Sequence, residues 1–465
     1  MNPLEGTRLR WVTFLVTGAM FMEVLDGNII ATALPDMARS FSVHAVQLNV
    51  AMSAYLLALG VFIPVSGWIA DRLGPRQVFA CAIAGFTLTS VACGLVTDLH
   101  TFVALRVLQG ASGALMVPVG RLLVLRHTPQ AGRMAAMSNL VWPALVAPVL
   151  APPLGGFIVN HASWHWIFFL NVPLGIVAFG LALWLIPKLE PAAHKPFDWT
   201  GFALCGGGMF ALLGALEQLT NGVDVVNLLV FMGGGLLLAA ALWHLRRAAS
   251  PMLDLAPMRI ATFRAAMVGG SFSRMGISSL PFLLPLMFQL GLGMDALHSG
   301  LWLLVMFAGN LGMKTVTTPI LRRFGYRPVM LLNGLLAALC LAAWALVGPA
   351  TPAAVLVPML FVSGMTRSMQ FTCLGTIAFA DVPERQMADA NSLFNVISQV
   401  SMAAGITLGA MAIRVGQGMS GLLGFSMAAF EYKLAFVVAA TVALAGLLDT
   451  LRLPQGAGDH FVARK

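Results

Sequence analysis

Residues 67–76 read GWIADRLGPR, between an apolar run that ends at Gly67 and another that begins at Gln77. A membrane loop this short needs a tight turn, which Gly74 permits, and Gly67 is expected to let two helices approach closely. Asp71 can face a helix N-terminus or an arginine of a neighbouring helix, in a contact that only one conformation makes. A short turn whose charges set the topology explains the stretch equally well. The predicted conformational gate comprises Gly67, Asp71, Arg72, Gly74 and Arg76.

The same pattern occurs a second time in the chain. LRRFGYRPV at 321–329 repeats the spacing of ADRLGPRQV at 70–78, with an offset of 251 residues. RVLQ at 106–109 is echoed by RSMQ at 367–370, with an offset of 261 residues. Because the offsets are nearly equal and the order is kept, the chain contains two related halves. Parallel halves around a central cavity are typical of transporters.

Long apolar runs fill the chain between such turns. Of the 465 residues, 59% are hydrophobic and only 10% are charged. A soluble domain carries about 25% charged residues, so this composition excludes a soluble enzyme, a disordered scaffold and a receptor with a single anchor. About 20 helical residues cross a hydrocarbon core about 30 Å thick, so each run can span a membrane. The fourteen runs lie at 11–33, 46–67, 77–97, 101–122, 134–159, 164–187, 199–219, 225–245, 262–291, 297–319, 328–348, 352–380, 388–413 and 433–451.

The repeat relates the first six runs to the last six and leaves two runs between them. We predict an all-α integral membrane protein with fourteen transmembrane helices, arranged as two six-helix bundles plus two inserted helices. The predicted units are an N-terminal bundle at 1–190, an insert at 191–258 and a C-terminal bundle with its tail at 259–465. If the N-terminus is cytoplasmic, the inner segments hold nineteen Lys and Arg residues and the outer segments three, so both termini are expected inside.

Charged side chains inside the apolar runs are costly, at about 2.5–3.5 kcal/mol each for a helix centre, and are usually functional. Glu23 and Asp26 stand three residues apart and share one face of the first helix. Asp26 and Arg106 both fall about 8–10 Å from the outer surface, so the two can meet. Proton coupling requires an acid whose hold on a proton changes with its arginine partner, which makes Glu23, Asp26 and Arg106 the coupling candidates. A static structural ion pair is the alternative.

Two further arginines, Arg274 and Arg367, are also deep, so deep bases outnumber deep acids by three to two. This balance does not favour a lipophilic cation as substrate, whereas an anionic or zwitterionic substrate fits it. Gln370 and Asn395 join these two arginines as substrate-cavity candidates, on their helix positions only.

The fifth apolar run carries Pro148, Pro152 and Pro153, followed by Gly155 and Gly156. Each proline removes a backbone donor, so this helix is expected to bend or unwind locally. The two glycines are expected to allow close contact with another helix. For any single residue here, a kinked packing helix is as good an interpretation as a functional motif.

Five stretches, in this order along the chain, resemble motifs of the major facilitator superfamily in its fourteen-helix drug:proton antiporter branch, of the multidrug efflux type. They are LDGNIIATALP at 25–35, the loop at 67–76, RVLQG at 106–110 with Gly113, APPLGG at 151–156 and WHW at 164–166. The chain departs from the branch at Asn28, Ala151 and His165, where Thr, Gly and Arg are usual. The resemblance implies proton-driven export, with the helix-5 motif helping to keep antiporters from leaking protons.

We therefore predict a proton-coupled antiporter that exports small amphipathic molecules or drugs across the bacterial cytoplasmic (inner) membrane. Its expected partners are a small-molecule substrate, protons and membrane lipids, and it is expected to act as a monomer. The alternative with the same fold is a dedicated exporter or uniporter for a single metabolite, anionic or zwitterionic.

Other functional classes are disfavoured by the sequence. Metal-ligand spacing, Walker motifs and a Ser/His/Asp set at one depth are missing, so we expect no enzyme activity, no cofactor, no metal and no direct use of ATP. The net charge of +9 comes from single or paired basic residues between apolar runs, which sets topology and does not indicate nucleic-acid binding. A transporter-like sensor is disfavoured because no signalling segment is recognised.

Overall fold

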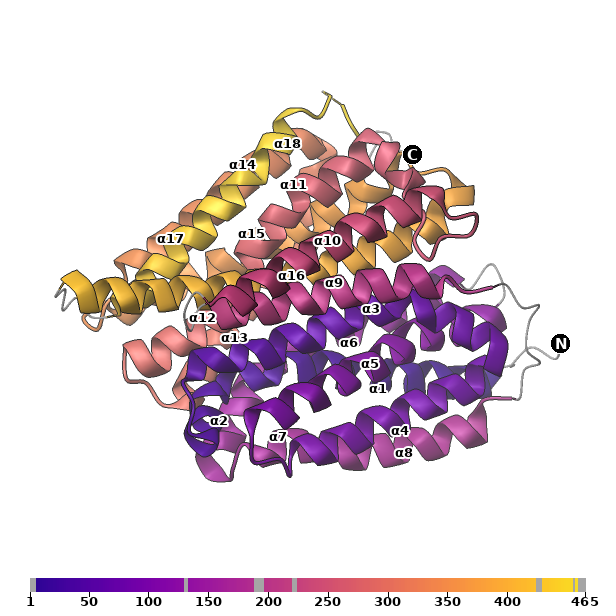
Figure 1. Ribbon diagram of the computed structural model, residues 1–465, viewed down its shortest axis with the longest axis horizontal. Coiled ribbons are helices and arrows are strands. Elements are labelled where there is room, and N and C mark those ends of the chain that lie inside the picture. Colours follow the sequence, from indigo (N-terminus) through magenta and orange to yellow (C-terminus); the bar gives the residue numbers. More distant parts are fainter. Residues whose placement is uncertain are drawn as a thin grey trace.

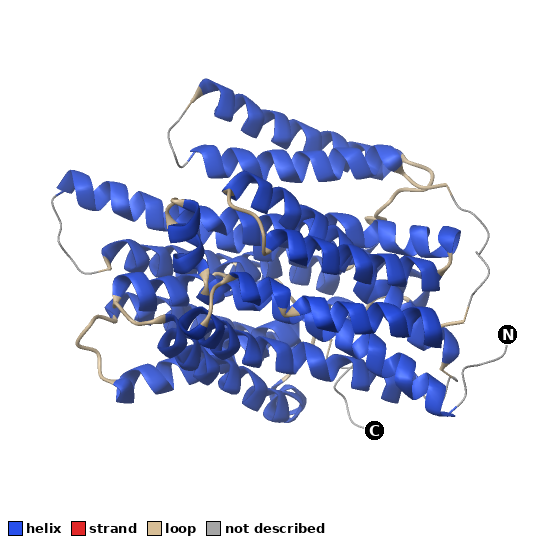
Figure 2. Cartoon of the chain, turned by 90° about the horizontal axis from the view of Figure 1, so that it is seen from below, coloured by secondary structure: helices blue, strands red, loops and turns tan. Residues whose placement is uncertain are grey.

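The computed structural model describes residues 6–128, 133–187, 196–219, 224–423, 429–454 and 456–458. Within these ranges the regular secondary structure is helical and includes no strand, as Figure 2 shows. A helix satisfies its backbone donors and acceptors internally, which a segment surrounded by lipid requires. The predicted all-α membrane fold is confirmed.

The N-terminal half begins with a long helix and ends with a helix broken near its start. Its elements are α1 (Gly6–Ile29), η1 (Ile30–Thr32), α2 (Leu34–Phe41), η2 (Ala45–Leu48), α3 (Asn49–Leu73), α4 (Pro75–Cys93), α5 (Leu99–His127), α6 (Arg133–His161), α7 (His165–Phe169) and α8 (Asn171–Leu185). Asp98 caps α5 by accepting the Thr101 N–H at 2.9 Å, and this hydrogen bond lowers the pKa of the Asp98 carboxyl.

Two helices lie between the halves, and the C-terminal half follows. The elements are α9 (Trp199–Leu219), α10 (Val225–Arg247), η4 (Ala256–Arg259), α11 (Ala261–Ser278), α12 (Leu280–Leu286), η5 (Met287–Gly291), α13 (Ala296–Phe324), α14 (Tyr326–Ala343), η6 (Trp344–Leu346), α15 (Ala353–Ala380), η7 (Glu384–Gln386), α16 (Met387–Leu423), α17 (Phe430–Ala445) and α18 (Leu447–Leu451). Asp295 caps α13 by accepting the His298 N–H at 2.8 Å, which lowers the pKa of Asp295.

The repeated sequence folds into the same tight turn in each half. Gly74 ends α3 with φ +88° and donates its N–H to the Ala70 carbonyl at 3.0 Å. Gly325 ends α13 with φ +75° and donates to the Leu321 carbonyl at 2.9 Å. A positive φ favours glycine, because it has no Cβ. The tight turn predicted at Gly74 is therefore confirmed, and its repeat also forms.

The apolar run at 262–291 is not one continuous helix. α11 ends at Ser278, α12 begins at Leu280, and the π-helical turn η5 follows α12. Pro281 and Pro285 have no backbone donor, which accounts for the change in the hydrogen-bond ladder. The apolar run predicted as one transmembrane helix is therefore divided at Ser279.

The two halves lie side by side, with the inserted helices along their junction. In Figure 1 the N-terminal half (indigo to purple) lies below the C-terminal half (orange to yellow), and the N and C labels both lie toward the right. α6 packs against α13 and α3 packs against α16, so these four helices form most of the contact between the halves. α9 packs against α10 and also touches α3.

Eleven helical segments within the described residues are long and apolar enough to cross a membrane. Each predicted run has a helical counterpart, but α6, α11–α12 and α15 are not among the eleven. The multi-pass character of the chain is confirmed, whereas the number of fourteen spans stays a prediction.

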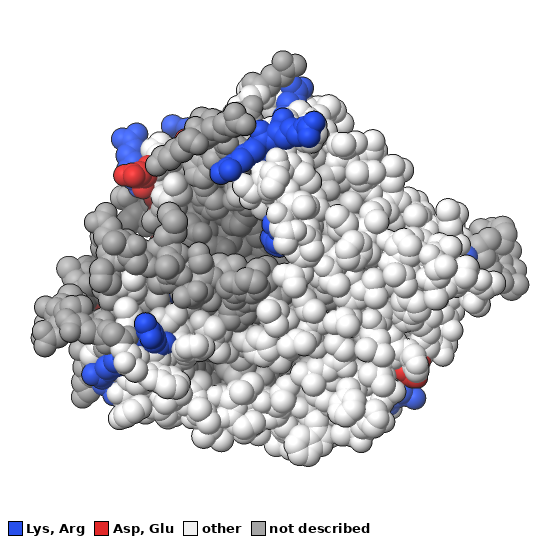
Figure 3. All heavy atoms as spheres, turned by 180° about the vertical axis from the view of Figure 1, so that it is seen from behind, with Lys and Arg blue, Asp and Glu red and all other residues white. Residues whose placement is uncertain are grey.

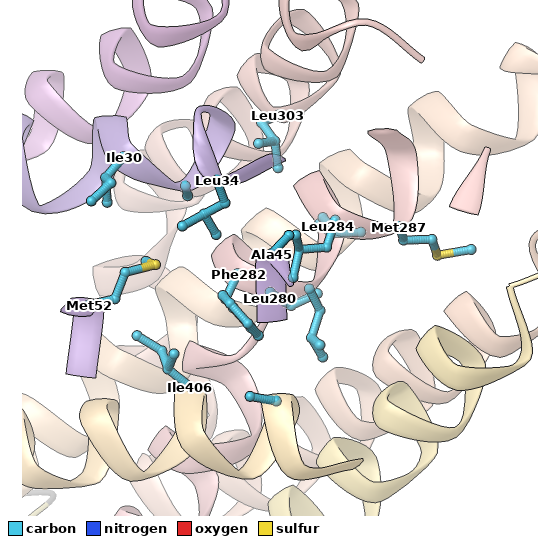
Figure 4. Close-up of a cluster of buried hydrophobic side chains, with 14 of the residues drawn as sticks. Ile30, Leu34, Ala45, Met52, Leu280, Phe282, Leu284, Met287, Leu303 and Ile406 are labelled. Carbon is cyan, nitrogen blue, oxygen red and sulfur yellow. The ribbon is translucent and has the colours of Figure 1, made fainter. Parts of the chain in front are cut away.

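A large apolar cluster joins the halves at one end, and a small cluster that includes Leu57 of α3 and Ala403 of α16 joins them farther along these helices. A joint apolar cluster combines Ile30 and Leu34 of the N-terminal half with Leu280, Leu284 and Ile406 of the C-terminal half (Figure 4). The other two large clusters each stay on one side of the junction: one belongs to the N-terminal half, the other to the insert and the C-terminal half. The molecule is therefore closed at the end that holds α2 and more loosely joined toward the end that holds the termini.

The surface matches a membrane setting. In Figure 3 the lysines and arginines gather mainly toward one end of the visible face, which is the end of the termini in Figure 1, and a broad uncharged belt covers the rest. Large apolar side chains are exposed across the molecule; Trp184, Ile176 and Leu346 are 75%, 64% and 86% exposed. Lipid solvates such side chains favourably, whereas water does not.

Candidate transport site

Asp26 and Arg106 form a buried ion pair between α1 and α5. Arg106 Nη1 lies 2.5 Å from Asp26 Oδ2, and both side chains are inaccessible to solvent. The contact expected from their similar depth is therefore present. The Arg106 guanidinium also lies 4.1 Å from the ring centroid of Tyr55, which adds a cation–π contact.

Three donors converge on the Asp26 carboxylate. Besides Arg106, Gln109 Nε2 donates to Oδ1 at 3.1 Å, and Asn171 Nδ2 donates to the same oxygen at 2.8 Å. Gln109 Nε2 also donates to Ser90 Oγ at 2.7 Å, so the network joins α1, α4, α5 and α8. The carboxylate is the counter-ion of a buried cation, and removing one partner of such a pair is strongly unfavourable.

Gly110 explains how α5 comes close enough to α3 for this arrangement. A Cβ at Gly110 would lie 2.9 Å from Ala58 Cβ, and it would also collide with the Tyr55 carbonyl. The glycine that follows RVLQ therefore lets Arg106 reach the ring of Tyr55. The Tyr55 hydroxyl in turn donates to the Glu23 backbone carbonyl at 3.3 Å, which ties α3 to α1.

A cavity of about 170 Å³ lies between the two halves, with room for a small ligand and water. α1 and α3 line it on the N-terminal side, and α11, α12, α15 and α16 line it on the C-terminal side. Met52 and Ile406 line the cavity and also belong to the joint apolar cluster of Figure 4. That cluster therefore closes the cavity toward the end that holds α2.

Glu23 lines this cavity from α1, one helical turn before Asp26. Its Oε2 atom is buried and has no hydrogen-bond partner among the described residues. The two acids predicted as coupling candidates therefore differ in their surroundings. A proton from the cavity can bind Glu23 without breaking a hydrogen bond of that oxygen, whereas Asp26 is fully engaged.

Arg367 lines the same cavity from α15. Its Nε and Nη1 atoms are buried without a hydrogen-bond partner in the described part of the chain. The guanidinium lies 5.6 Å and 5.5 Å from the ring centroids of Phe307 and Phe371. Aromatic faces compensate a buried cation only in part, since such a contact contributes about 0.5–2 kcal/mol.

The other predicted cavity residues lie elsewhere. Arg274 is inside the C-terminal bundle, 4.8 Å from the ring centroid of Phe394. Gln370 is fully buried, and Asn395 Nδ2 donates within its own helix at 2.8 Å. Among the four predicted cavity residues, the structure brings only Arg367 to the cavity.

The predicted gate residues form a turn with contacts on both sides. The Arg72 guanidinium lies 5.3 Å from the ring centroid of Trp68, and Arg76 donates to the Leu183 carbonyl of α8. Asp71 is partly buried. The loop is thus tied to the N-terminal bundle through its basic residues, while a gating role of the loop stays a prediction.

The close helix approach expected at Gly67 is not observed in this conformation. A Cβ at Gly67 would meet no described atom within 4 Å. The neighbouring Trp68 makes the contacts instead, with ring centroids 5.3 Å from Phe197 and 5.5 Å from Trp199. Because the large Trp68 ring fills the space between α3 and the start of α9, the backbones stay apart.

The motif in α6 is partly as expected. The helix continues through its three prolines without local unwinding, because the rest of the hydrogen-bond ladder holds it, and the alternative of a bend stays a prediction. The expected close packing is confirmed. A Cβ at Gly156 would lie 2.8 Å from Leu297 Cα of α13, and a Cβ at Gly155 would lie 2.8 Å from the Ile29 carbonyl oxygen of α1.

Comparison with known sequences agrees with this architecture. The family described as Major Facilitator Superfamily matches residues 16–406. The chain belongs to this superfamily. A putative multidrug resistance protein MdtD of Cronobacter sakazakii is 38% identical over 413 residues, which cover 86% of this chain and 85% of that relative. A protein of the same name from Klebsiella pneumoniae is 37% identical over 473 residues, with 98% and 97% covered.

Solved structures of the superfamily share the fold. A POT family transporter in complex with 5-aminolevulinic acid superposes with a TM-score of 0.70 at 15% identity, covering 99% of each chain. A D-xylose-proton symporter superposes with a TM-score of 0.69 at 13% identity, covering 97% of this chain and 99% of that one. At such identities these likenesses show the fold alone. As a major facilitator protein, the chain is a membrane transporter and not an enzyme.

Several polar residues of this major facilitator site escaped the sequence analysis. Asn171 and Ser90 complete the network around Asp26, while Ser278 and Gln399 line the cavity beside Arg367. Each is an uncharged polar residue inside an apolar run, and that signal is weak because many such residues only bond to their own helix. Their importance depends on which helix faces they share with the charged residues.

Proposed function

We propose that the chain is a proton-coupled antiporter that exports small amphipathic molecules, drugs among them, across the bacterial inner membrane. The observation that carries this proposal is the arrangement of two acids on α1, with Glu23 at the cavity and Asp26 in a buried ion pair. The relatives' names, putative multidrug resistance proteins, support drugs as the cargo.

Glu23 is the better candidate for the exchanging proton, because its Oε2 atom lacks a partner in the described residues and its side chain lines the cavity. Asp26 and Arg106 then act as the fixed charge pair that holds α1 against α5. Asp26 stays the second candidate. It would exchange a proton only in a conformation that separates it from Arg106.

Transport would proceed by rocking of the two bundles, 1–190 and 259–465, about the cavity, with 191–258 as the insert. The boundary near 190 lies outside the described residues. The joint apolar cluster closes the α2 end, which supports an inward-facing state if that end faces outward. The basic end in Figure 3 supports cytoplasmic termini by the positive-inside rule. We propose that the transporter acts as a monomer surrounded by membrane lipid.

The rival is a uniporter or dedicated exporter for one metabolite. Proteoliposomes containing the purified chain, loaded with a pH dye, separate the two. A panel of fluorescent amphipaths of each charge class is added with and without an imposed proton gradient. We expect at least one compound to accumulate above its equilibrium level only with the gradient and to move protons the opposite way. If every transported compound only equilibrates and no proton moves, the chain is a uniporter.

A further inference from the structure

The cavity has an unsatisfied polar group on each of its two walls. On the N-terminal wall, Glu23 Oε2 is buried without a partner; on the C-terminal wall, the same holds for Arg367 Nε and Nη1. Ser278 Oγ and Gln399 Oε1 add two more atoms without a partner on the C-terminal wall. Among the residues that the structure describes, which include the whole cavity lining, none of these atoms has a hydrogen-bond partner.

The acid and the base do not satisfy each other. Glu23 and Arg367 line one cavity, yet no ion pair joins them among the described residues. Elsewhere in the same membrane core, Asp26 and Arg106 do pair, at 2.5 Å, so an acid of α1 can meet an arginine where the helices bring the two together. The two separated charges are therefore placed for a ligand that carries a complementary charge at each end.

The chemistry of each wall defines that ligand. A guanidinium presents a planar fork of donors that matches a carboxylate or another compact oxyanion. A carboxylate opposite it accepts an ammonium group. The rest of the lining is mostly apolar, with Met52, Leu56 and Met402 among the side chains. Such a lining suits an apolar body.

We propose that the cavity binds an amphipathic zwitterion, with its anionic group at Arg367 and its cationic group at Glu23. The proposal rests on the antiport function above and names its substrate class. It also gives that function a coupling rule, because the ammonium group of the substrate and a proton compete for the same carboxylate. Arg121 of α5 and Asp26 of α1 are the charged side chains near enough to act on Glu23 among the described residues. A substrate with only an anionic group would instead be repelled by the ionised form of Glu23.

The test uses three dansyl compounds that differ by one group. Nα-dansyl-lysine carries a carboxylate and an ammonium group, dansylcadaverine lacks the carboxylate, and dansyl-norleucine lacks the ammonium group. Binding to the full chain in lipid nanodiscs is measured by dansyl fluorescence, without any proton gradient. We expect Nα-dansyl-lysine to bind more tightly than either of the other two compounds.

Variants then assign each charge to its wall. Arg367→Gln should weaken Nα-dansyl-lysine and dansyl-norleucine by about tenfold to a hundredfold, the range of a lost charge-assisted hydrogen bond, and leave dansylcadaverine unchanged. Glu23→Gln should weaken Nα-dansyl-lysine and dansylcadaverine and spare dansyl-norleucine. Arg246→Gln, at the exposed end of α10, removes the same charge outside the cavity and should change none of them.

The outcomes separate this inference from the antiport function. Equal binding of the three compounds, or an equal loss of all three in Arg367→Gln, would overturn the zwitterion site. Arg367→Lys keeps the charge and should retain part of the preference for the carboxylate. If the charge-specific binding holds while no gradient drives transport, the antiport proposal fails and the binding site stands. If a proton gradient drives transport that does not depend on Arg367, the zwitterion site fails and the antiport proposal stands.

Discussion

The two halves place equivalent arginines in opposite situations. Arg106 in α5 has the Asp26 carboxylate at 2.5 Å, whereas its repeat counterpart, Arg367 in α15, has no carboxylate partner among the described residues. Each of the two guanidinium groups keeps two buried nitrogens without a hydrogen-bond partner in that part of the chain. The glutamines that follow them differ in the same way. Gln109 donates to Asp26, whereas Gln370 accepts from Asn333 Nδ2 at 2.9 Å. The repeat keeps the cation but not its counter-ion.

The difference originates in the first helix of each half. α1 carries Glu23 and Asp26, whereas α11 has no acid and carries Arg264 and Arg274. The predicted gate loop at 67–76 and its repeat at 321–329, together called the gate loops, also differ in charge. Arg322 occupies the position equivalent to Asp71. A buried pair stabilises one conformation of the protein, whereas an unpaired charge at a cavity is available to a ligand. Arg106 is thus held by its counter-ion, whereas Arg367 is available to a ligand.

The largest effect is expected from a variant that breaks the Asp26–Arg106 ion pair of the N-terminal half. Arg106→Gln removes the counter-ion of the buried Asp26 and leaves the neutral donors Gln109 and Asn171, so we expect a loss of about 3 kcal/mol in folding stability and a clear fall in Tm. Arg367→Gln removes a cation without a carboxylate partner, so its Tm should be unchanged or higher. Thermal unfolding in detergent measures both. Equal falls in Tm would mean that Arg367 has a structural partner after all, and the contrast between the halves would be lost.

The second effect separates the two acids of α1. Glu23→Gln removes the acid at the cavity, so gradient-driven accumulation should vanish while exchange of substrate without a gradient persists. Because Glu23 Oε2 has no partner in the described residues, the Tm should stay near that of the unchanged protein. Asp26→Asn should lower the Tm, since it leaves Arg106 without its counter-ion.

Vesicle transport and thermal unfolding of the same preparations decide this point, with Glu384→Gln on the exposed surface as the matched control. Coupling that survives Glu23→Gln but not Asp26→Asn would move the proton site to Asp26. Coupling that survives the double variant would leave a uniporter as the better account.

The sequence was sufficient for the architecture and for the pairs of residues that share a depth. Helix position alone brought Asp26 to Arg106, and the repeated motifs located both gate turns. It failed where the outcome depends on packing between helices. The helix is interrupted at Ser279, just before Pro281, but continues through the prolines of α6, although every proline lacks the same donor. Depth also could not show which deep arginine lines the cavity, since that depends on how each helix is rotated in its bundle.

The smallest expected effect concerns the gate loops, which extend the comparison to the inner surface. If Asp71 biases the protein toward one conformation, Asp71→Asn should slow turnover by about tenfold, the effect of a contact of about 1.4 kcal/mol in a two-state equilibrium. Binding of Nα-dansyl-lysine should not change, because the loop is remote from the cavity lining.

Arg322→Gln alters the equivalent position of the C-terminal half, which carries the opposite charge, and should change turnover by less than about twofold if only Asp71 makes the switching contact. Turnover and binding measured on both variants give the answer. Full turnover in Asp71→Asn would leave only a short turn with topology-setting charges, and equal losses in both variants would mean that the two halves share the gate despite their opposite charges.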